Sequence, residues 1–176
     1  MDFQISTKAP GPKISPGVVE GLYILSSDLT TIATQPNSPA TQAEKVTIAT
    51  AHIPTVGEGF RKMYISNKKS ELKITGEGDE DAKSAKCELE VFIPGLTANL
   101  AAFLYDDPDM IFLVPNGPCG TSEYFQLGTK CDGAKISKWE FTTGKFGGSE
   151  VKGVKATIQS LQSSILLYTA AIPVPA

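Results

Sequence analysis

The sequence predicts a mainly β protein: an antiparallel β-sandwich or barrel with one short α-helix packed against it. Three observations lead to this fold class. Apolar and polar residues alternate along several stretches, as they do in strands with one buried face. A single stretch repeats its apolar residues at helical spacing. Strand patterns do not alternate with helix patterns, so a parallel βαβ architecture is excluded.

Composition sets the number of domains and excludes several classes of protein. The 176 residues are 41% hydrophobic and 20% charged, which is enough for one well-filled core. We expect an extended N-terminal arm over residues 1–17 and a single β domain over residues 18–176. The net charge of -3 argues against a protein that neutralises nucleic-acid phosphates. Neither a membrane span nor a signal peptide is visible, so we expect synthesis in the cytoplasm.

The clearest pattern is a strand followed at once by a helix. Residues 87–93 alternate Cys, Leu, Val and Ile with two glutamates, so a half-buried strand is expected there. A helix should follow, and either Thr97 or the turn before it can cap its first free N–H groups. Asp106, Asp107 and Pro108 should end it, because carboxylates oppose the dipole at a helix C-terminus and proline disfavours continuation. The apolar stripe of this helix is Leu96, Leu100, Phe103 and Leu104.

The remaining patterns bring the expected total to about eight or nine strands. An apolar run over residues 110–114 predicts a strand covered on both faces, with the helix covering one of them. Alternation of Val154, Ala156 and Ile158 with polar residues predicts the last strand. The other expected strands are residues 18–26, 45–53, 59–66, 71–76, 124–131 and 134–146.

Two segments have little to bury by themselves. Residues 7–17 hold three prolines and two glycines, which predicts an extended arm. Residues 28–44 form a long polar stretch, and we expect a loop that lies outside the core. Loops of this length are usually functional or ordered by a partner. A mobile surface loop is the alternative.

Cysteine and histidine content gives no strong indication of a metal or redox site. Cys87 lies in phase with the buried face of its strand and is expected in the core. Cys119 and Cys131 could form a bridge, but a cytoplasmic origin favours reduced thiols. His52 is the only histidine, and we expect an ordinary residue at a strand end rather than a metal ligand.

Acidic residues cluster in two places without a catalytic pattern. The acidic turn in residues 76–84 lacks the alternate-residue ligands of a calcium loop, so a solvated hairpin tip is expected. Asp106, Asp107 and Asp109 could supply paired carboxylates for glycoside chemistry, but a helix stop is favoured. We therefore assign no catalytic, cofactor-binding or metal-binding residue, and we expect a protein that is not an enzyme.

The order of these elements resembles the tail tube proteins of long-tailed phages. The resemblance is carried by the sequence Phe-Ile-Pro-Gly at residues 92–95, a short amphipathic helix, an apolar strand, and a C-terminal hairpin through Thr143-Gly144 and Gly153. Residues 51–74 also resemble the early strands of tube proteins. By architecture the resemblance covers roughly residues 17–168. The family is structurally similar to the tube protein of type VI secretion systems.

This resemblance implies a structural virion protein. It implies self-assembly into rings of six subunits, with sheets joined edge to edge around a channel, and stacking of rings into a tail tube. The expected partners are further copies of the chain and other tail proteins; DNA would pass through the lumen during ejection without specific binding, and no membrane or cofactor is implied. A mildly acidic lumen would repel DNA phosphates. Two alternatives remain open: another β-rich virion component, such as a decoration or tail-completion protein, or a carbohydrate-binding β-sandwich.

Overall fold

The computed structural model describes residues 18, 20–66, 70–79, 83–117, 122–145 and 151–175. The arm at 1–17, Cys119, the apex of the acidic turn and the middle of the last hairpin connection lie outside these residues. Within the described residues there are twelve strands, one α-helix and two short 3₁₀ turns, η1 (Ser26–Asp28) and η2 (Ala43–Lys45). The strands are β1 (Glu20–Leu25), β2 (Leu29–Thr31), β3 (Thr47–Ile48), β4 (Ile53–Pro54), β5 (Arg61–Tyr64), β6 (Glu71–Glu77), β7 (Ser84–Pro94), β8 (Met110–Pro115), β9 (Tyr124–Leu127), β10 (Lys135–Thr142), β11 (Gly153–Gln162) and β12 (Leu166–Tyr168).

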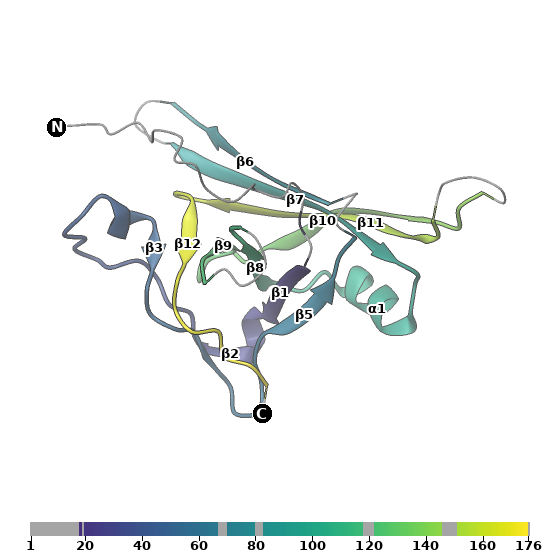
Figure 1. The fold of residues 1–176 in the computed structure, drawn as a ribbon, viewed down its shortest axis with the longest axis horizontal. Helices are drawn as coiled ribbons and strands as arrows, with labels where there is room; N and C mark the ends of the chain where they lie inside the picture. The colour runs from purple at the N-terminus through teal and green to yellow at the C-terminus, as the bar shows by residue number, and fades with distance from the viewer. Residues whose placement is uncertain are drawn as a thin grey trace.

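The strands form an open β-sandwich, so the expected fold class is confirmed in its sandwich form and not as a closed barrel (Figure 1). One sheet has the order β10-β11-β7-β6, and the other has the order β3-β12-β9-β8-β1-β5. A small separate ladder joins β2 and β4. All strand pairs of the four-stranded sheet are antiparallel. In the six-stranded sheet the pair β12–β3 is parallel, which the sequence did not indicate.

The first core cluster lies between the two sheets and follows the predicted alternation. Cys87, Leu89 and Val91 of β7 are completely buried, and Val154, Ala156 and Ile158 of β11 lie beside them. From the other sheet, Met110, Phe112 and Val114 of β8 pack against the same cluster. A fully buried valine, leucine, isoleucine, phenylalanine or methionine side chain contributes about 1.5–3 kcal/mol, so these three strands contribute strongly to the stability.

A second core cluster covers the opposite face of the six-stranded sheet. Ile111 and Leu113 of β8 point into it, so β8 is buried on both faces as its sequence predicted. The cover consists of residues from short strands and loops, including Ala33, Ile48, Phe60 and Tyr168. The helix was expected to cover a face of β8. Instead it adds the buried Leu104 and the partly buried Leu100 and Phe103 to the first cluster, and the four-stranded sheet supplies the rest of the cover.

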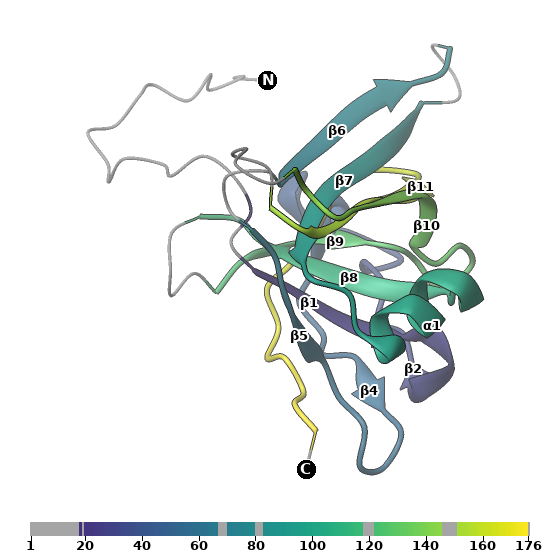
Figure 2. The same cartoon turned by 90° about the vertical axis from the view of Figure 1, so that its right-hand side faces the viewer.

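The helix α1 (Ala98–Asp106) closes one end of the sandwich (Figure 2). Thr97 caps it as expected, because its side-chain oxygen accepts the N–H of Leu100 at 3.2 Å. The ring of Phe103 meets that of Tyr23 edge to face, with centroids 5.6 Å apart. Leu96, expected in the apolar stripe, precedes the helix and is exposed. The helix ends at Asp106, and Asp107 follows with the left-handed φ of 42°.

Two sequence expectations for residues 28–53 are wrong. The strand expected over 45–53 is two strands of two residues, because the chain bends to bury both Ile48 and His52. The loop expected over 28–44 begins with β2, and Ala33 is buried in the second cluster. Part of this stretch is therefore ordered by the chain itself rather than by a partner.

Candidate functional site

The outward face of the four-stranded sheet, together with its two edge strands, is one candidate functional surface. Within the described residues, β6 and β10 are the edge strands and have a neighbouring strand on one side only. The β6–β7 hairpin extends beyond the rest of the sandwich (Figure 2). β6 has seven residues and β10 has eight, so both edges are long. A long edge presents a row of unpaired N–H and C=O groups that can pair with another chain.

The outward face is polar and carries both signs of charge. The ammonium of Lys155 contacts the carboxylate of Glu90 at 3.1 Å, and that of Lys86 contacts Glu88 at 3.0 Å. The hydrogen bond from Lys86 is the main reason why the pKa of Glu88 is lowered. From the register of the strands, the charged residues on this face are Glu71, Lys73, Glu77, Lys86, Glu88, Glu90, Lys135, Lys138, Glu140 and Lys155. Lysines and glutamates balance, so the face is not an acidic surface.

A buried polar centre lies on the other side of the molecule, around His52. The imidazole is 2% exposed and stacks on the ring of Tyr168 with centroids 4.8 Å apart. Its Nδ1 accepts the N–H of Ala33 at 3.0 Å, and its Nε2 lies 3.0 Å from Oε1 of Gln126. Because Nδ1 accepts, the neutral ring carries its proton on Nε2 and donates it to Gln126. Burial lowers the pKa of His52, so this neutral form is favoured.

This arrangement is structural rather than catalytic. The hydroxyl of Tyr168 donates to the carbonyl of Ala171 at 2.8 Å, and the N–H of His52 donates to the Tyr168 oxygen at 3.3 Å. His52 was expected near the end of a strand over residues 45–53; it lies instead between the two short strands β3 and β4. Its contacts with Ala33 and Gln126, which join three segments that are distant in the sequence, were not predicted. No local pattern in the sequence indicates such contacts.

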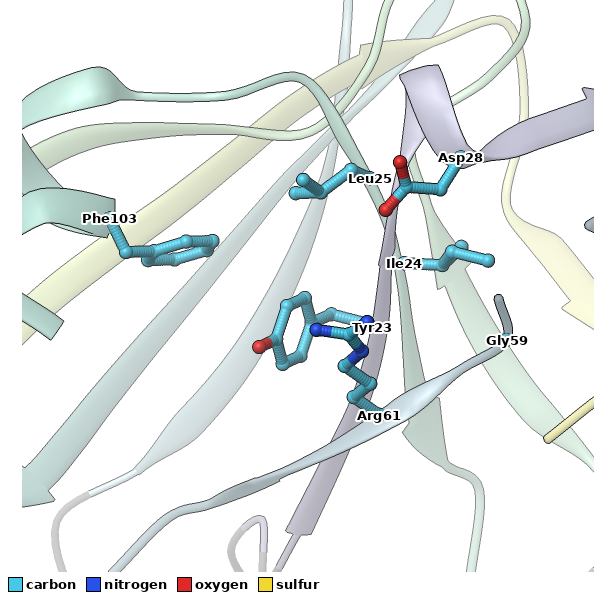
Figure 3. A pocket seen from close by; sticks show the side chains of 7 residues that line it. All are labelled: Tyr23, Ile24, Leu25, Asp28, Gly59, Arg61 and Phe103. Atoms are coloured by element: carbon cyan, nitrogen blue, oxygen red, sulfur yellow. The ribbon is translucent and has the colours of Figure 1, made fainter. Parts of the chain in front are cut away.

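A small pocket lies between the start of β5 and the helix (Figure 3). Its volume is about 170 Å³, and Figure 3 shows Tyr23, Phe103 and Arg61 around it. Arg61 is held by an ion pair with Glu58 at 2.7 Å. The seven lining residues include neither a nucleophile with a base in contact nor a set of converging ligands. The pocket therefore gives no indication of a reaction.

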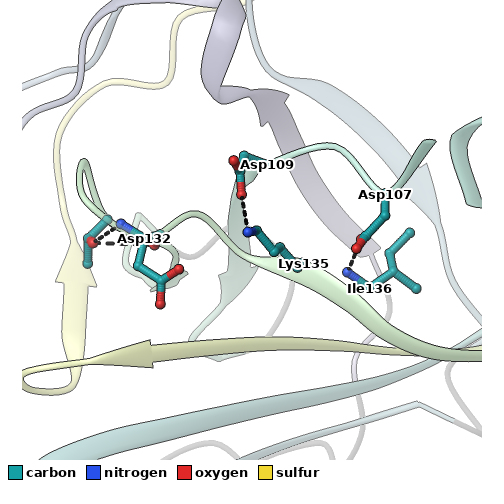
Figure 4. Close-up of polar contacts among 6 residues, drawn as sticks. Asp107, Asp109, Asp132, Lys135 and Ile136 are labelled. Atoms are coloured by element: carbon teal, nitrogen blue, oxygen red, sulfur yellow. Dashed lines mark hydrogen bonds and ion pairs between the residues drawn. The ribbon is translucent and has the colours of Figure 1, made fainter.

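The acidic residues after the helix fix a loop instead of forming a catalytic pair (Figure 4). Oδ1 of Asp107 accepts the N–H of Ile136 at 2.7 Å, and Asp109 lies 3.4 Å from the ammonium of Lys135. Both contacts tie the connection between α1 and β8 to the start of β10. The expectation that these residues end the helix is confirmed for Asp106 and Asp107. The contacts with β10 were not visible in the sequence.

The cysteines and acidic residues form no recognised metal site in the described part of the chain. Cys87 is fully buried as predicted, and burial raises the pKa of its thiol to about 11. Cys131 is exposed and free. No group of three His, Cys, Asp or Glu side chains among the described residues is arranged to hold a metal ion.

None of the described helices is long and apolar enough to span a bilayer.

Comparisons with known proteins add no assignment. The chain matches no protein-family model, no curated protein and no solved structure. The function has to be argued from the fold and from the open sheet edges.

Proposed function

We propose that this chain is a structural subunit that self-assembles into stacked rings, as the tail tube subunits of long-tailed phages do. The observation that carries the proposal is the four-stranded sheet, neither of whose two edge strands has a second neighbouring strand in the described residues. Only the start of β10 is occupied, where Asp107 accepts the N–H of Ile136. Natural proteins usually protect such edges, and closing a ring of sheets removes them altogether. Rings of six subunits, stacked into a channel for DNA in the virion tail, are the form that the resemblance implies.

The charge distribution supports a channel whose wall does not bind DNA. If the outward face of this sheet lines the lumen, its lysines and glutamates offer no excess of positive charge to the phosphates. Repulsion by an acidic lumen is not supported for this face, because the two signs balance. DNA could pass along a neutral, hydrated surface without specific contacts.

The carbohydrate-binding alternative is not favoured by the arrangement of aromatic residues. The exposed aromatic side chains of the described residues are Tyr64, Tyr105 and Trp139. They belong to three different elements, β5, α1 and β10, and so give no stacking platform of neighbouring rings on one strand or sheet face. The form of the purified assembly distinguishes a tube subunit from a decoration or tail-completion protein.

The proposal is tested by light scattering and negative-stain microscopy of the purified full chain over a range of concentrations. Rings that stack into tubes are the expected result. A chain that stays monomeric under every condition overturns the proposal. Single rings that never stack would indicate a tail-completion role instead.

Ring stacking can be tested separately from folding. Residues 36–41 are mostly exposed, whereas Ala33 contacts His52 and Gln35 donates to Ser164. Replacing residues 36–41 by a short Gly-Ser linker should therefore keep the fold and the rings. If this loop joins adjacent rings, tubes are lost while the unfolding curve stays unchanged. Tubes of normal length from the deletion variant would exclude the loop as the stacking element.

A further inference from the structure

The two free edges of the four-stranded sheet complement each other in direction. Each neighbouring pair in the order β10-β11-β7-β6 is antiparallel, so β6 runs opposite to β10. Rotation about an axis that runs along the strands does not change the direction of any strand. Therefore β6 of one copy would meet β10 of the next copy antiparallel, and the alternation of the sheet would continue across the contact.

The inward sides of these edges carry apolar residues that one subunit does not fully cover. Leu72 and Ile74 of β6 pair with buried residues of β7 but are themselves only partly buried. Trp139 of β10 pairs with the buried Ala156, so both residues lie on the inward side of the sheet. The exposed fraction of Trp139 is nevertheless 51%. Phe141 lies on the same side and is also partly buried. Both edges thus present apolar side chains on the core side of the sheet.

One register of β6 against β10 places apolar residues opposite apolar residues on the inward side and opposite charges together on the outward side. If Lys73 lies opposite Glu140, then Leu72 lies opposite Phe141 and Ile74 lies opposite Trp139. An opposite-charge pair on one face and two pairs of aliphatic with aromatic residues on the other are favourable cross-strand neighbours. A shift by two residues places Glu71 against Glu140 and Lys73 against Lys138, and like charges directly opposite are destabilising. Charge therefore rejects this slip. A shift by two residues the other way places Glu77 opposite Lys138 and Ile74 opposite Phe141, so charge allows it. It also places Gly76 opposite Trp139, so one of the two aliphatic–aromatic pairs is lost and the first register remains favoured.

We propose that β6 of one subunit pairs antiparallel with β10 of a second copy of this chain, with Lys73 opposite Glu140. This inference rests on the proposed ring assembly and names the two edges that make it. Ser137 marks the limit of the contact, because the ladder between β10 and β11 has an irregularity between Ile136 and Lys138. The contact is heterologous, so it uses both edges of every subunit and can close a ring.

Homotypic pairing is the competing arrangement. A two-fold contact between two β6 strands can place Glu71 opposite Lys73, but it centres on Leu72 alone. A two-fold contact between two β10 strands can place Lys138 opposite Glu140, but it centres on Trp139 alone. Each gives one central apolar pair where the mixed contact gives two, and each leaves the other edge open. The mixed pairing is therefore favoured.

Cysteine cross-linking tests the register directly. Lys73→Cys and Glu140→Cys are made in separate full-length chains, one of them tagged, with Cys119 and Cys131 changed to Ser. Cys87 stays, because it is fully buried. Mixing the two chains under mild oxidation should give mainly the mixed disulfide dimer, since directly opposite residues have the separation that a disulfide needs. Glu71→Cys or Thr75→Cys mixed with Glu140→Cys should cross-link much less, because these pairs belong to shifted registers.

Charge exchange tests the same contact without oxidation. Lys73→Glu alone, or Glu140→Lys alone, should raise the concentration needed for assembly by about tenfold or more, because each juxtaposes like charges. The double exchange should restore assembly. Lys86→Glu is the control, since Lys86 lies on the central strand β7 of the outward face and its cross-strand partners are Thr75 and Leu161 rather than Lys73 or Glu140.

The outcomes separate this inference from the proposed function. Rings without a mixed disulfide, or with self-dimers of either variant, overturn the β6–β10 contact while ring assembly stands. A mixed disulfide in a chain that forms no rings supports the contact and overturns the ring proposal. If neither rings nor the mixed disulfide form, both are overturned.

Discussion

The two apolar clusters differ in how the chain builds them, although they share β8 between them. The first cluster is formed by long strands whose buried residues follow every second position, such as Leu89 and Val91 of β7. The second cluster is formed by single residues from short strands and loops around the polar centre of His52. Strand alternation is enough to build the first. The second depends on hydrogen bonds between segments that are far apart in the sequence.

The largest expected effect is the loss of stability from a cavity in the first cluster. Leu89→Ala should lower the free energy of unfolding by about 2–5 kcal/mol, because Leu89 is completely buried between the sheets. Leu161→Ala is the matched control on the neighbouring strand β11, and should change it by no more than about 0.5 kcal/mol, since Leu161 is 53% exposed. Urea unfolding measures both. Equal effects would mean that the alternation does not define the core.

A smaller effect is expected when the second cluster is tested by pH. The pKa of His52 is lowered from 6.5 in the folded protein, so the unfolded chain binds more protons as the pH falls below 6.5. The contribution of His52 to the free energy of unfolding should therefore be fully present above pH 6.5 and should decrease below it. The decrease is at most about 1.4 kcal/mol per pH unit. The protonated ring would also place an N–H of Nδ1 against the N–H of Ala33.

His52→Gln is the control for this pH dependence, because glutamine keeps a polar side chain but does not titrate. The variant should be less stable at neutral pH and should lose the part of the pH dependence that begins below 6.5. Hydrogen exchange at the amide of Ala33 should show whether the second cluster opens before the first. Simultaneous opening of both clusters would show that they form one cooperative unit.

The smallest expected effect comes from a contact that belongs to neither core. Thr97→Ala removes the oxygen that accepts the N–H of Leu100, and should lower stability by about 1 kcal/mol. Thr97→Ser keeps the hydroxyl and should change stability much less. Thermal unfolding of the two variants compares them. An effect as large as that of Leu89→Ala would place the helix in the cooperative core rather than at its end.

Local patterns predicted the parts of the fold that depend on neighbouring residues. The period of two located β7 and β11, and the helical spacing with Thr97 located α1. The short strands β3 and β12 were not separable from loops, because two or three residues cannot show a period. The parallel pairing of β12 with β3 depends on segments that are far apart in the sequence. No spacing in the sequence reports such a contact.

The candidate assembly surface was predictable only in part. Alternation placed Glu88 and Glu90 on the outward face of β7, and that placement is confirmed. The sequence did not show which strands would be the edges of the sheet, because sheet order is set by distant pairings. Trp139 shows the same limit, since its inward phase and its exposure become meaningful only when β10 is known to be an edge.

The position of β12 between β9 and β3 has a consequence for the order of events during synthesis. Thr169 donates its N–H to Ile48, and Phe60 donates to Pro173, so the cover of the second cluster needs segments from both ends of the described chain. Until residues 166–173 have left the ribosome, the cover over the outer apolar face of β8 lacks Leu166 and Tyr168 and is incomplete. Such non-local pairing makes folding slow and leaves nascent chains prone to aggregation. We expect newly made subunits to need a chaperone, or rapid completion of the chain, before their sheet edges can meet another copy.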